Sequence, residues 1–318
     1  MNLTVHHLLF TLQAQTLVHL GPQAGAQIRG GLWAALREFA CAAPKVQGDP
    51  DHARHCPMCR LVALETAESA RGSTPPRPFA VRSPLPAHPG QDCLFRSGEN
   101  FVVGINLFGE AADSFPYLCQ AFHRLGQLGI GYGRGRFTIE RIQAVNPFTG
   151  ESHDLLQGQR VVALPALPVT EGLVQQAAQQ LPADVLRLRF LTPTELTHRG
   201  KQVDRPYFEV LIARLLERCQ ALEQHYTATP AARASWQERY QQLTEAARRV
   251  HLASDQTRWI RVRSGSRRTN SINAVSGFVG TATFEGDLEP FREWLMWGAS
   301  IHVGKNAVKG NGWYELSR

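Results

Sequence analysis

A histidine and two lysines stand in a glycine-rich stretch close to the end of the chain. The stretch reads IHVGKNAVKGNGWYEL, and it places His302 three residues before Lys305. Histidine suits general acid–base catalysis because its unperturbed pKa lies near neutrality. A lysine at this distance would stabilise negative charge that develops on a phosphate. The pattern predicts His302 and Lys305 as catalytic residues. In the alternative interpretation His302 only caps the loop through a hydrogen bond.

A cysteine cluster is the second group of residues that could do chemistry. Cys41, Cys56 and Cys59 follow the pattern C-x14-C-x2-C, with His52 and His55 just before the CxxC pair. Three thiolates and one imidazole make a closed tetrahedral zinc site, which holds a segment together without catalysing a reaction. We predict zinc ligands at Cys41, Cys56, Cys59 and His55. The alternative is a set of reduced thiols in a core. A zinc deaminase is excluded because no H-x-E motif precedes the cysteine pair.

Two glycine-rich loops have the composition that lets a sugar-phosphate chain approach the backbone. They are GIGYGRG at 129–135 and VGKNAVKGNG at 303–312. Each follows a predicted helix, whereas a dinucleotide-binding GxGxxG opens one, and no Ser or Thr follows Lys305 as a Walker loop requires. Glycines without a Cβ expose main-chain N–H groups, and flanking cations hold phosphates. The alternative is a turn that needs positive φ. The predicted RNA contacts are Arg134, Arg136, Gly304, Lys309, Gly310 and Gly312.

Positive charge is concentrated in the second half of the chain. The formal net charge is +7; residues 1–182 hold 14 Lys and Arg against 13 Asp and Glu, and residues 183–318 hold 20 against 14. This asymmetry favours an anionic partner such as nucleic acid, although a solvated basic face would give the same count. The segment RWIRVRSGSRR at 258–268 is predicted as a hairpin that contacts RNA through Arg261, Arg263, Arg267 and Arg268. A solvated sheet edge is the alternative.

An internal repeat relates the two halves. Four landmarks recur at an offset that stays between 174 and 179 residues, which is unlikely to arise by chance. The matched residues are His19 with His198, Phe101 with Phe278, Pro116 with Pro290, and Gly135 with Gly312.

Each half repeats one order of predicted elements. Each half begins with a strand (3–12, 184–191), which is followed by a helix (27–40, 206–222) and a second strand (101–108, 278–284). A helix that begins beside proline, a glycine loop and a last strand complete each half. The order β-α-β-(β)-α-β predicts an α+β protein of two tandem ferredoxin-like domains.

The expected domains are 1–165, with a cysteine-containing insertion at 41–100, and 183–318 with the glycine-rich loop. Helix- and strand-breaking residues mark the junction between the domains at 146–183. Residues 71–90 are predicted as a proline-rich extended segment, and residues 231–252 are predicted as an added helix.

Composition limits the cellular setting. No run of about 18 apolar residues is present, so no membrane span is expected. The first residues lack a basic region and a cleavage site, so we predict no signal peptide and a cytoplasmic location. The six cysteines are then expected to be reduced.

The C-terminal pattern GFVGTATFEGDLEPF…IHVGKNAVKGNGWYEL at 277–316 resembles the CRISPR precursor-RNA-processing endoribonucleases of the RAMP superfamily, the Cas6 group. The stretch GAQIRGGLW at 25–33 is similar to the helix start of many RAMP proteins and adds Arg29 to the expected RNA contacts. The chain departs from the family in the Lys-Asn-Ala-Val-Lys of its loop, where a Gly-Thr pair is commoner, and in its cysteine-bearing insertion.

The resemblance implies metal-independent cleavage of CRISPR repeat RNA by the neighbouring 2′-hydroxyl. The products would be a 2′,3′-cyclic phosphate, a 5′-hydroxyl and a crRNA that joins other CRISPR effector subunits. It also implies a general base just after the first helix, where His52 and His55 lie. No cofactor is expected for catalysis. The alternatives are a non-catalytic RAMP-type crRNA-binding subunit and a zinc-stapled interaction protein.

Overall fold

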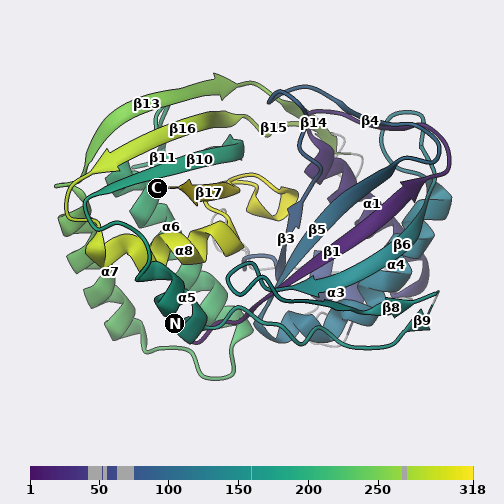
Figure 1. The fold of residues 1–318 in the computed structure, drawn as a ribbon, viewed down its shortest axis with the longest axis horizontal. Helices are drawn as coiled ribbons and strands as arrows, with labels where there is room; N and C mark the ends of the chain where they lie inside the picture. The colour runs from purple at the N-terminus through teal and green to yellow at the C-terminus, as the bar shows by residue number, and fades with distance from the viewer. Residues whose placement is uncertain (42–51, 53–55, 63–74, 159, 267–270, 318) are drawn as a thin grey trace. The chain divides into compact units, whose positions relative to one another are not determined.

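The computed structural model describes the chain except residues 42–51, 53–55, 63–74, 159, 267–270 and 318. The chain divides into two compact units. The N-terminal unit contains His6–Pro84 and Gln91–Pro168, and the C-terminal unit contains Met1–Val5, Leu85–Gly90 and Val169–Arg318. Figure 1 labels the elements of both units.

The N-terminal unit is built on a five-stranded sheet. Its strand order is β3-β5-β1-β6-β7, and β1 and β6 are antiparallel. Helices α1 and α4 pack together behind this sheet (Figure 1). The bounds are β1 Val5–Ala14, β2 Val18–Leu20, α1 Ala24–Phe39, α3 Pro57–Val62, β3 Phe79–Arg82, β4 Cys93–Phe95, β5 Asn100–Phe108, α4 Phe115–Leu128, β6 Phe137–Val145, β7 Ser152–Asp154, β8 Leu156–Gln157 and β9 Arg160–Val161.

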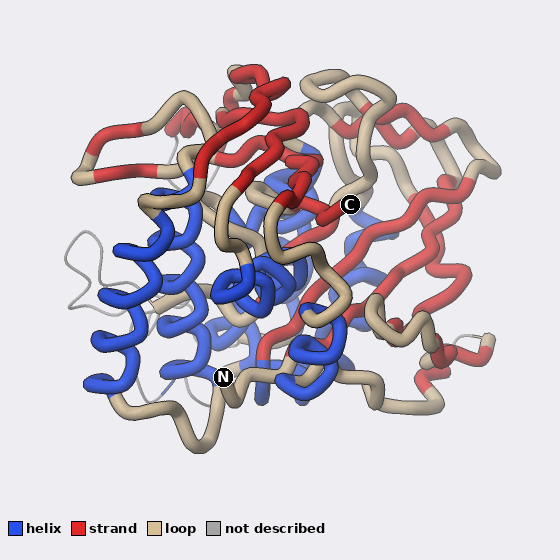
Figure 2. Tube along the Cα trace, turned by 60° about the vertical axis from the view of Figure 1, so that its left-hand side comes forward, coloured by secondary structure: helices blue, strands red, loops and turns tan. Residues whose placement is uncertain are grey.

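The C-terminal unit is built on a four-stranded sheet of order β13-β16-β10-β17. Helices α6 and α7 lie side by side, as Figure 2 shows, and α8 packs on α6 and β17. The bounds are α5 Glu171–Ala178, β10 Val185–Thr194, β11 Thr197–His198, β12 Lys201–Gln202, α6 Phe208–Tyr226, α7 Arg233–Ala247, β13 His251–Ile260, β14 Arg263–Ser266, β15 Ser271–Ala274, β16 Gly277–Glu285, α8 Arg292–Ile301 and β17 Tyr314–Ser317.

The two sheets share one topology, which confirms the predicted tandem ferredoxin-like fold. In each unit the first strand of the repeat (β1 or β10) lies at the centre, between the third (β5 or β16) and the fourth (β6 or β17). The structure reproduces the match of Phe101 with Phe278, because β5 begins at Asn100 and β16 begins at Gly277, each one residue before its phenylalanine. Alternating burial along β10 points Leu186, Leu188 and Phe190 into the core.

Two segments contain more regular structure than the sequence prediction gave them. The predicted junction at 146–183 contains a helix, α5, which begins after Thr170 and buries Val174 and Ala178 four residues apart. The proline-rich segment at 71–90 contains the edge strand β3, which pairs with β5 through the register Phe79 to Leu107. An edge strand tolerates neighbouring prolines because only one of its sides carries ladder hydrogen bonds.

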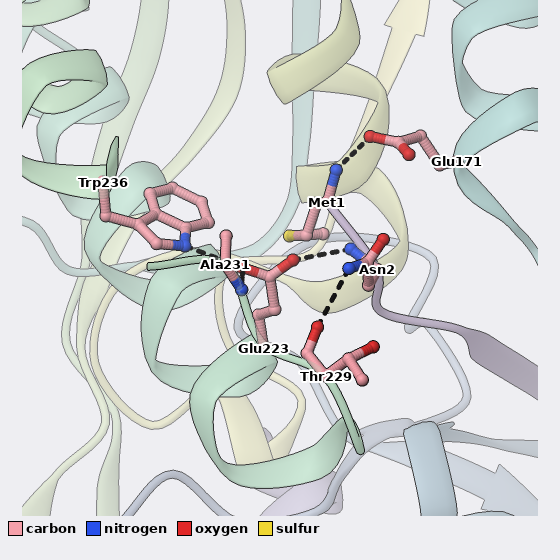
Figure 3. Close-up of polar contacts among 7 residues, drawn as sticks. All are labelled: Met1, Asn2, Glu171, Glu223, Thr229, Ala231 and Trp236. Atoms are coloured by element: carbon pink, nitrogen blue, oxygen red, sulfur yellow. Dashed lines mark hydrogen bonds and ion pairs between the residues drawn. The ribbon is translucent and has the colours of Figure 1, made fainter. Parts of the chain in front are cut away.

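A buried carboxylate holds three segments of the C-terminal unit together. Glu223 of α6 is fully buried, and it accepts hydrogen bonds from the backbone N–H of Asn2 at 2.6 Å and from Nε1 of Trp236 at 2.7 Å. The backbone N–H of Ala231 approaches the same carboxylate at 3.4 Å. Figure 3 shows these contacts converging on the Glu223 side chain. The first residues of the chain and the start of α7 are therefore both anchored on α6.

A buried histidine makes the stability of the N-terminal unit sensitive to acid. Burial, aided by the positive charge of Arg82 and opposed by a hydrogen bond with Asn106, lowers the pKa of His7 to about 3. The unfolded chain would bind this proton near pH 6.5, so protons favour unfolding between about pH 6.5 and pH 3.

We expect the free energy of unfolding of this unit to fall across that window, by at most about 1.4 kcal/mol per pH unit from this group. Denaturant titrations at several pH values, with hydrogen exchange of β1, measure the slope. His7→Gln, which cannot titrate, should flatten it; an equal slope in that variant would assign the effect to other groups.

Candidate functional site

His302 lies at the end of α8 and inside the protein. Its backbone adopts a left-handed φ of 64°, and its N–H donates to the carbonyl of Gly298 at 2.8 Å, so it ends the helix. The ring is fully buried and lies parallel to the Trp313 indole, with ring centroids 6.2 Å apart. In this structure the side chain is packed in the protein interior rather than presented to a substrate.

A half-buried arginine contacts the same helix end. Nε of Arg218, on α6, donates to the carbonyl of Ile301 at 2.8 Å. A cation at a helix C-terminus is favourable because the last carbonyls carry the negative end of the helix dipole. Burial lowers the pKa of Arg218 to about 10. The guanidinium therefore remains charged at neutral pH and fixes the point at which the loop begins.

The glycines of the loop are required by close backbone contacts. Gly312 has φ +72°, its N–H donates to the carbonyl of Pro193, and its carbonyl accepts from the N–H of Val303. A Cβ at Gly312 would lie 1.8 Å from the carbonyl oxygen of Val303, and one at Gly304 would lie 2.4 Å from that of Glu195. These two glycines shape a turn that folds back on the segment after β10.

Lys305 is held by an acidic partner. Its Nζ lies 2.6 Å from Oε1 of Glu195, and its backbone N–H donates to the Glu195 carbonyl at 3.0 Å. The lysine side chain is 56% exposed, whereas the carboxylate is only 10% exposed. Lys305 can therefore meet an anion from solvent, but Glu195 already neutralises part of its charge.

The remaining predicted contacts of the C-terminal unit differ in exposure. Lys309 is half-buried, and Gly310 and Gly312 are buried, so bare backbone is accessible in this loop mainly near Gly304. Arg261, after β13, and Arg263, which opens the β14–β15 hairpin, are exposed. Arg267 and Arg268 lie outside the described residues.

The first glycine loop, 129–135, packs on strand β2. The N–H of Tyr132 donates to the carbonyl of His19 at 2.8 Å, and a Cβ at Gly135 would lie 2.2 Å from the carbonyl oxygen of Leu17. Gly129, Gly131 and Gly133 all have positive φ. Arg134 and Arg136 project from this loop and are exposed, as RNA contacts must be.

A histidine paired with a carboxylate lies beside this loop. Nε2 of His19 is 2.5 Å from Oδ2 of Asp92, and the Tyr132 ring meets the imidazole edge-on at 4.9 Å. The Tyr132 hydroxyl accepts from Nε2 of Gln23 at 3.0 Å. His19 is 32% exposed, Asp92 39% and Tyr132 48%. We call His19, Asp92 and Tyr132 the His19 group; it can exchange a proton with a bound molecule through an imidazole whose orientation the carboxylate fixes.

Sequence reasoning missed the His19 group as a chemical site. His19 appears in the sequence as a landmark of the repeat, matched to His198. Asp92 lies 73 residues away and carries no pattern that links it to His19. The pairing of β2 with β4 brings them together, since His19 lies opposite Leu94 in that ladder.

The predicted cysteine ligands come together at one place. Cys41, Cys56 and Cys59 lie with His52 in a group whose ligand atoms are all within 4.8 Å of one another, a group that could hold a metal ion. The predicted histidine ligand was His55, which lies outside the described residues; His52 occupies the fourth position among those described. Nearby, Nη2 of Arg29 donates to the carbonyl of Val62 at 3.3 Å, so this predicted RNA contact links α1 to the end of α3.

Two family models together span most of the chain. Residues 3–167 match a model named AF_1859_N and described as an N-terminal domain. Residues 188–314, which run from β10 through the glycine loop to β17, match the model of the CRISPR-associated endoribonuclease Cas6. The C-terminal region of the chain, residues 188–314, is a Cas6-family domain. The resemblance to Cas6 endoribonucleases predicted from the C-terminal pattern is therefore confirmed.

Solved Cas6 structures share the fold of this chain along its whole length. A Cas6 from Thermus thermophilus matches with TM-score 0.55 and 16% identity over 100% of both chains. A Cas6 product complex matches with TM-score 0.56 and 17% identity over 99% of both chains. A partial Cas6-RT-Cas1–Cas2 complex gives TM-score 0.59 and 12% identity over 99% of this chain and 46% of the longer one. No curated protein matches the chain.

No described helix has the length and apolar character needed to span a membrane.

Proposed function

We propose that this protein cleaves CRISPR repeat RNA without a metal ion in the reaction, to give mature crRNA. The observation that carries the proposal is the match of residues 188–314 to an endoribonuclease family. Two ferredoxin-like sheets support it, because the last strand of each is preceded by a glycine loop that bears exposed cations.

The reaction would be an intramolecular transesterification. A base removes the proton of the 2′-hydroxyl, the 2′-oxygen bonds to phosphorus, and the bond from phosphorus to the 5′-oxygen breaks. An acid then gives a proton to the leaving 5′-oxygen. The products are a 2′,3′-cyclic phosphate and a 5′-hydroxyl, and cations stabilise the charged transition state.

The candidate residues differ in access to RNA. His302, His52 and His55 are the predicted proton-transfer residues, with Lys305 as the stabilising cation. His302 is fully buried, so we assign it to support of the loop. His19 is partly exposed and oriented by Asp92, so we add it as a candidate for direct proton transfer.

A second function is favoured by the same burial of His302 and by the Lys305–Glu195 ion pair. These contacts are compatible with a non-catalytic RAMP-type subunit that binds crRNA through the cation-bearing loops. Under this alternative the protein binds repeat RNA and leaves it intact.

Incubation with a CRISPR repeat RNA in EDTA separates the two functions. We expect one main cut with a cyclic phosphate on the 5′ fragment. A 2′-deoxynucleotide at the cut position should abolish cleavage while binding remains, because the attacking hydroxyl is gone. Binding without cutting of the all-ribose RNA would favour the subunit, and cutting that needs added Mg²⁺ would contradict the proposed mechanism.

The same assay distinguishes the histidines. His19→Ala and Asp92→Asn should slow cleavage with little change in RNA affinity if the His19 group transfers a proton. His302→Ala should reduce thermal stability together with cleavage if its role is to support the loop. Loss of cleavage in a stably folded His302→Ala variant would instead restore it as a direct participant.

We further propose that the crRNA product remains available to other CRISPR effector subunits and that the reaction takes place in the cytoplasm. No cofactor is assigned to the reaction itself. A structural zinc is argued separately below.

A further inference from the structure

We infer that Cys41, His52, Cys56 and Cys59 form a structural zinc site at the end of α1. The inference is independent of the proposed RNA cleavage. Cys41 directly follows Ala40, the residue that caps the end of α1, and Cys56 directly precedes α3, which contains Cys59. Cys56 and Cys59 are three residues apart at the start of α3, a spacing that puts both side chains on one side of a helix.

The distances fit a tetrahedral ion. Zinc lies about 2.3 Å from thiolate sulfur and about 2.0 to 2.1 Å from imidazole nitrogen. In a regular tetrahedron these lengths separate two sulfurs by about 3.8 Å and a sulfur from a nitrogen by about 3.5 Å. The Cys41 Sγ to His52 Nε2 distance is 3.5 Å. All four ligand atoms lie within 4.8 Å of one another, so only small shifts would close the site on an ion.

The ligand types and their burial point to zinc in a structural role. The three cysteines are 8%, 6% and 1% exposed, in the order Cys41, Cys56 and Cys59. Three sulfurs and one nitrogen are a ligand set that zinc prefers, while magnesium and calcium require oxygen. Four protein ligands also fill the coordination shell and leave no position for a substrate. The ion would join the end of α1 to the start of α3.

The choice of His52 has a chemical consequence. Coordination through Nε2 uses the lone pair that a general base needs, so His52 cannot accept a proton from RNA while zinc is bound. The assignment differs from the sequence prediction in one ligand, since His52 takes the position predicted for His55. His52 becomes the ligand, and His55 is left without a place among the four ligands.

Metal analysis of the purified full chain, without a histidine tag, tests the site. We expect about one zinc per chain by mass spectrometry, and a lower melting temperature after removal with a strong chelator. Readdition of zinc should restore the melting temperature. Cobalt added to the stripped protein should give the absorption bands of a tetrahedral thiolate site. Absence of stoichiometric metal, or stoichiometric iron in place of zinc, would overturn the inference.

Matched variants identify the ligands. Cys59→Ser and His52→Ala should weaken zinc affinity at least about tenfold. Cys119→Ser is the control, because Cys119 is also 8% exposed in the same unit but lies in α4, outside the group. His55→Ala should retain zinc. Retention of zinc by His52→Ala together with loss of zinc by His55→Ala would refute the assignment. Cobalt titration of the unaltered protein gives a readout even if a variant fails to fold.

Discussion

Replacement of Gly312 by alanine is expected to lower the free energy of unfolding of the C-terminal unit by roughly 2 to 5 kcal/mol. The glycine has φ +72°, where an L-residue is strained, and the new Cβ would lie 1.8 Å from the carbonyl oxygen of Val303. That oxygen belongs to a backbone held by the Val303 N–H bond to the Gly312 carbonyl, so it cannot simply rotate away. Denaturant unfolding, with hydrogen exchange of the segment 301–314, measures the effect.

Gly133→Ala is the matched control. Gly133 has nearly the same φ, +75°, but no heavy atom lies within 4 Å of its added Cβ. Only the backbone strain remains, so we expect a loss of roughly 1 to 2 kcal/mol in the N-terminal unit. The difference between the two losses of free energy measures the cost of the close contact at Gly312. Equal losses would mean that the Gly312 turn relaxes freely and that the close contact with Val303 imposes no cost.

Replacement of Glu223 by alanine is expected to cost the C-terminal unit roughly 3 to 5 kcal/mol. The change removes the acceptor of the Asn2 N–H and of the buried Trp236 Nε1, and it leaves a cavity on α6. An unsatisfied buried donor loses its solvation by water without any compensating bond. Denaturant unfolding with hydrogen exchange over α6 and the start of α7 measures the loss.

Glu223→Gln keeps the shape and one carbonyl acceptor, so it should cost less, about 1 to 3 kcal/mol. A cycle with Trp236→Phe separates the indole bond from the rest. If the Trp236 indole donates to Glu223, Trp236→Phe should lower the free energy of unfolding less in the Glu223→Gln protein than in the unaltered protein. Strict additivity of the two changes would show that they do not interact.

Periodic features made the fold predictable. The alternation in VLRLRF matches the burial of β10, and helical spacing of Ile28, Leu32 and Leu36 matches the buried face of α1. The repeat then supplied the topology, because two copies of one element order constrain each other. Element ends were less accurate. The predicted helix at 231–252 ends at Ala247, and β13 takes over from His251.

The chemical site was harder to predict because access and pairing are properties of the folded chain. His302 looks available in the sequence since it lies close to glycine and lysine, yet its ring is fully buried and parallel to Trp313. His52 and His55 are three residues apart, and composition alone does not say which one faces Cys41. The His19 and Asp92 contact depends on a strand ladder between segments 73 residues apart.

The anchoring of Asn2 on Glu223 bears on the order in which the protein can fold during synthesis. The first five residues belong to the unit that the ribosome completes last, so they leave the exit tunnel more than 200 residues before their partner on α6. The N-terminal unit can fold from His6 onward before the partner of this leading segment has been synthesised. A polypeptide cut at the boundary expected from sequence, residue 183, would carry Glu223 without the Asn2 N–H, and we expect it to fold less stably than the same region in the whole chain.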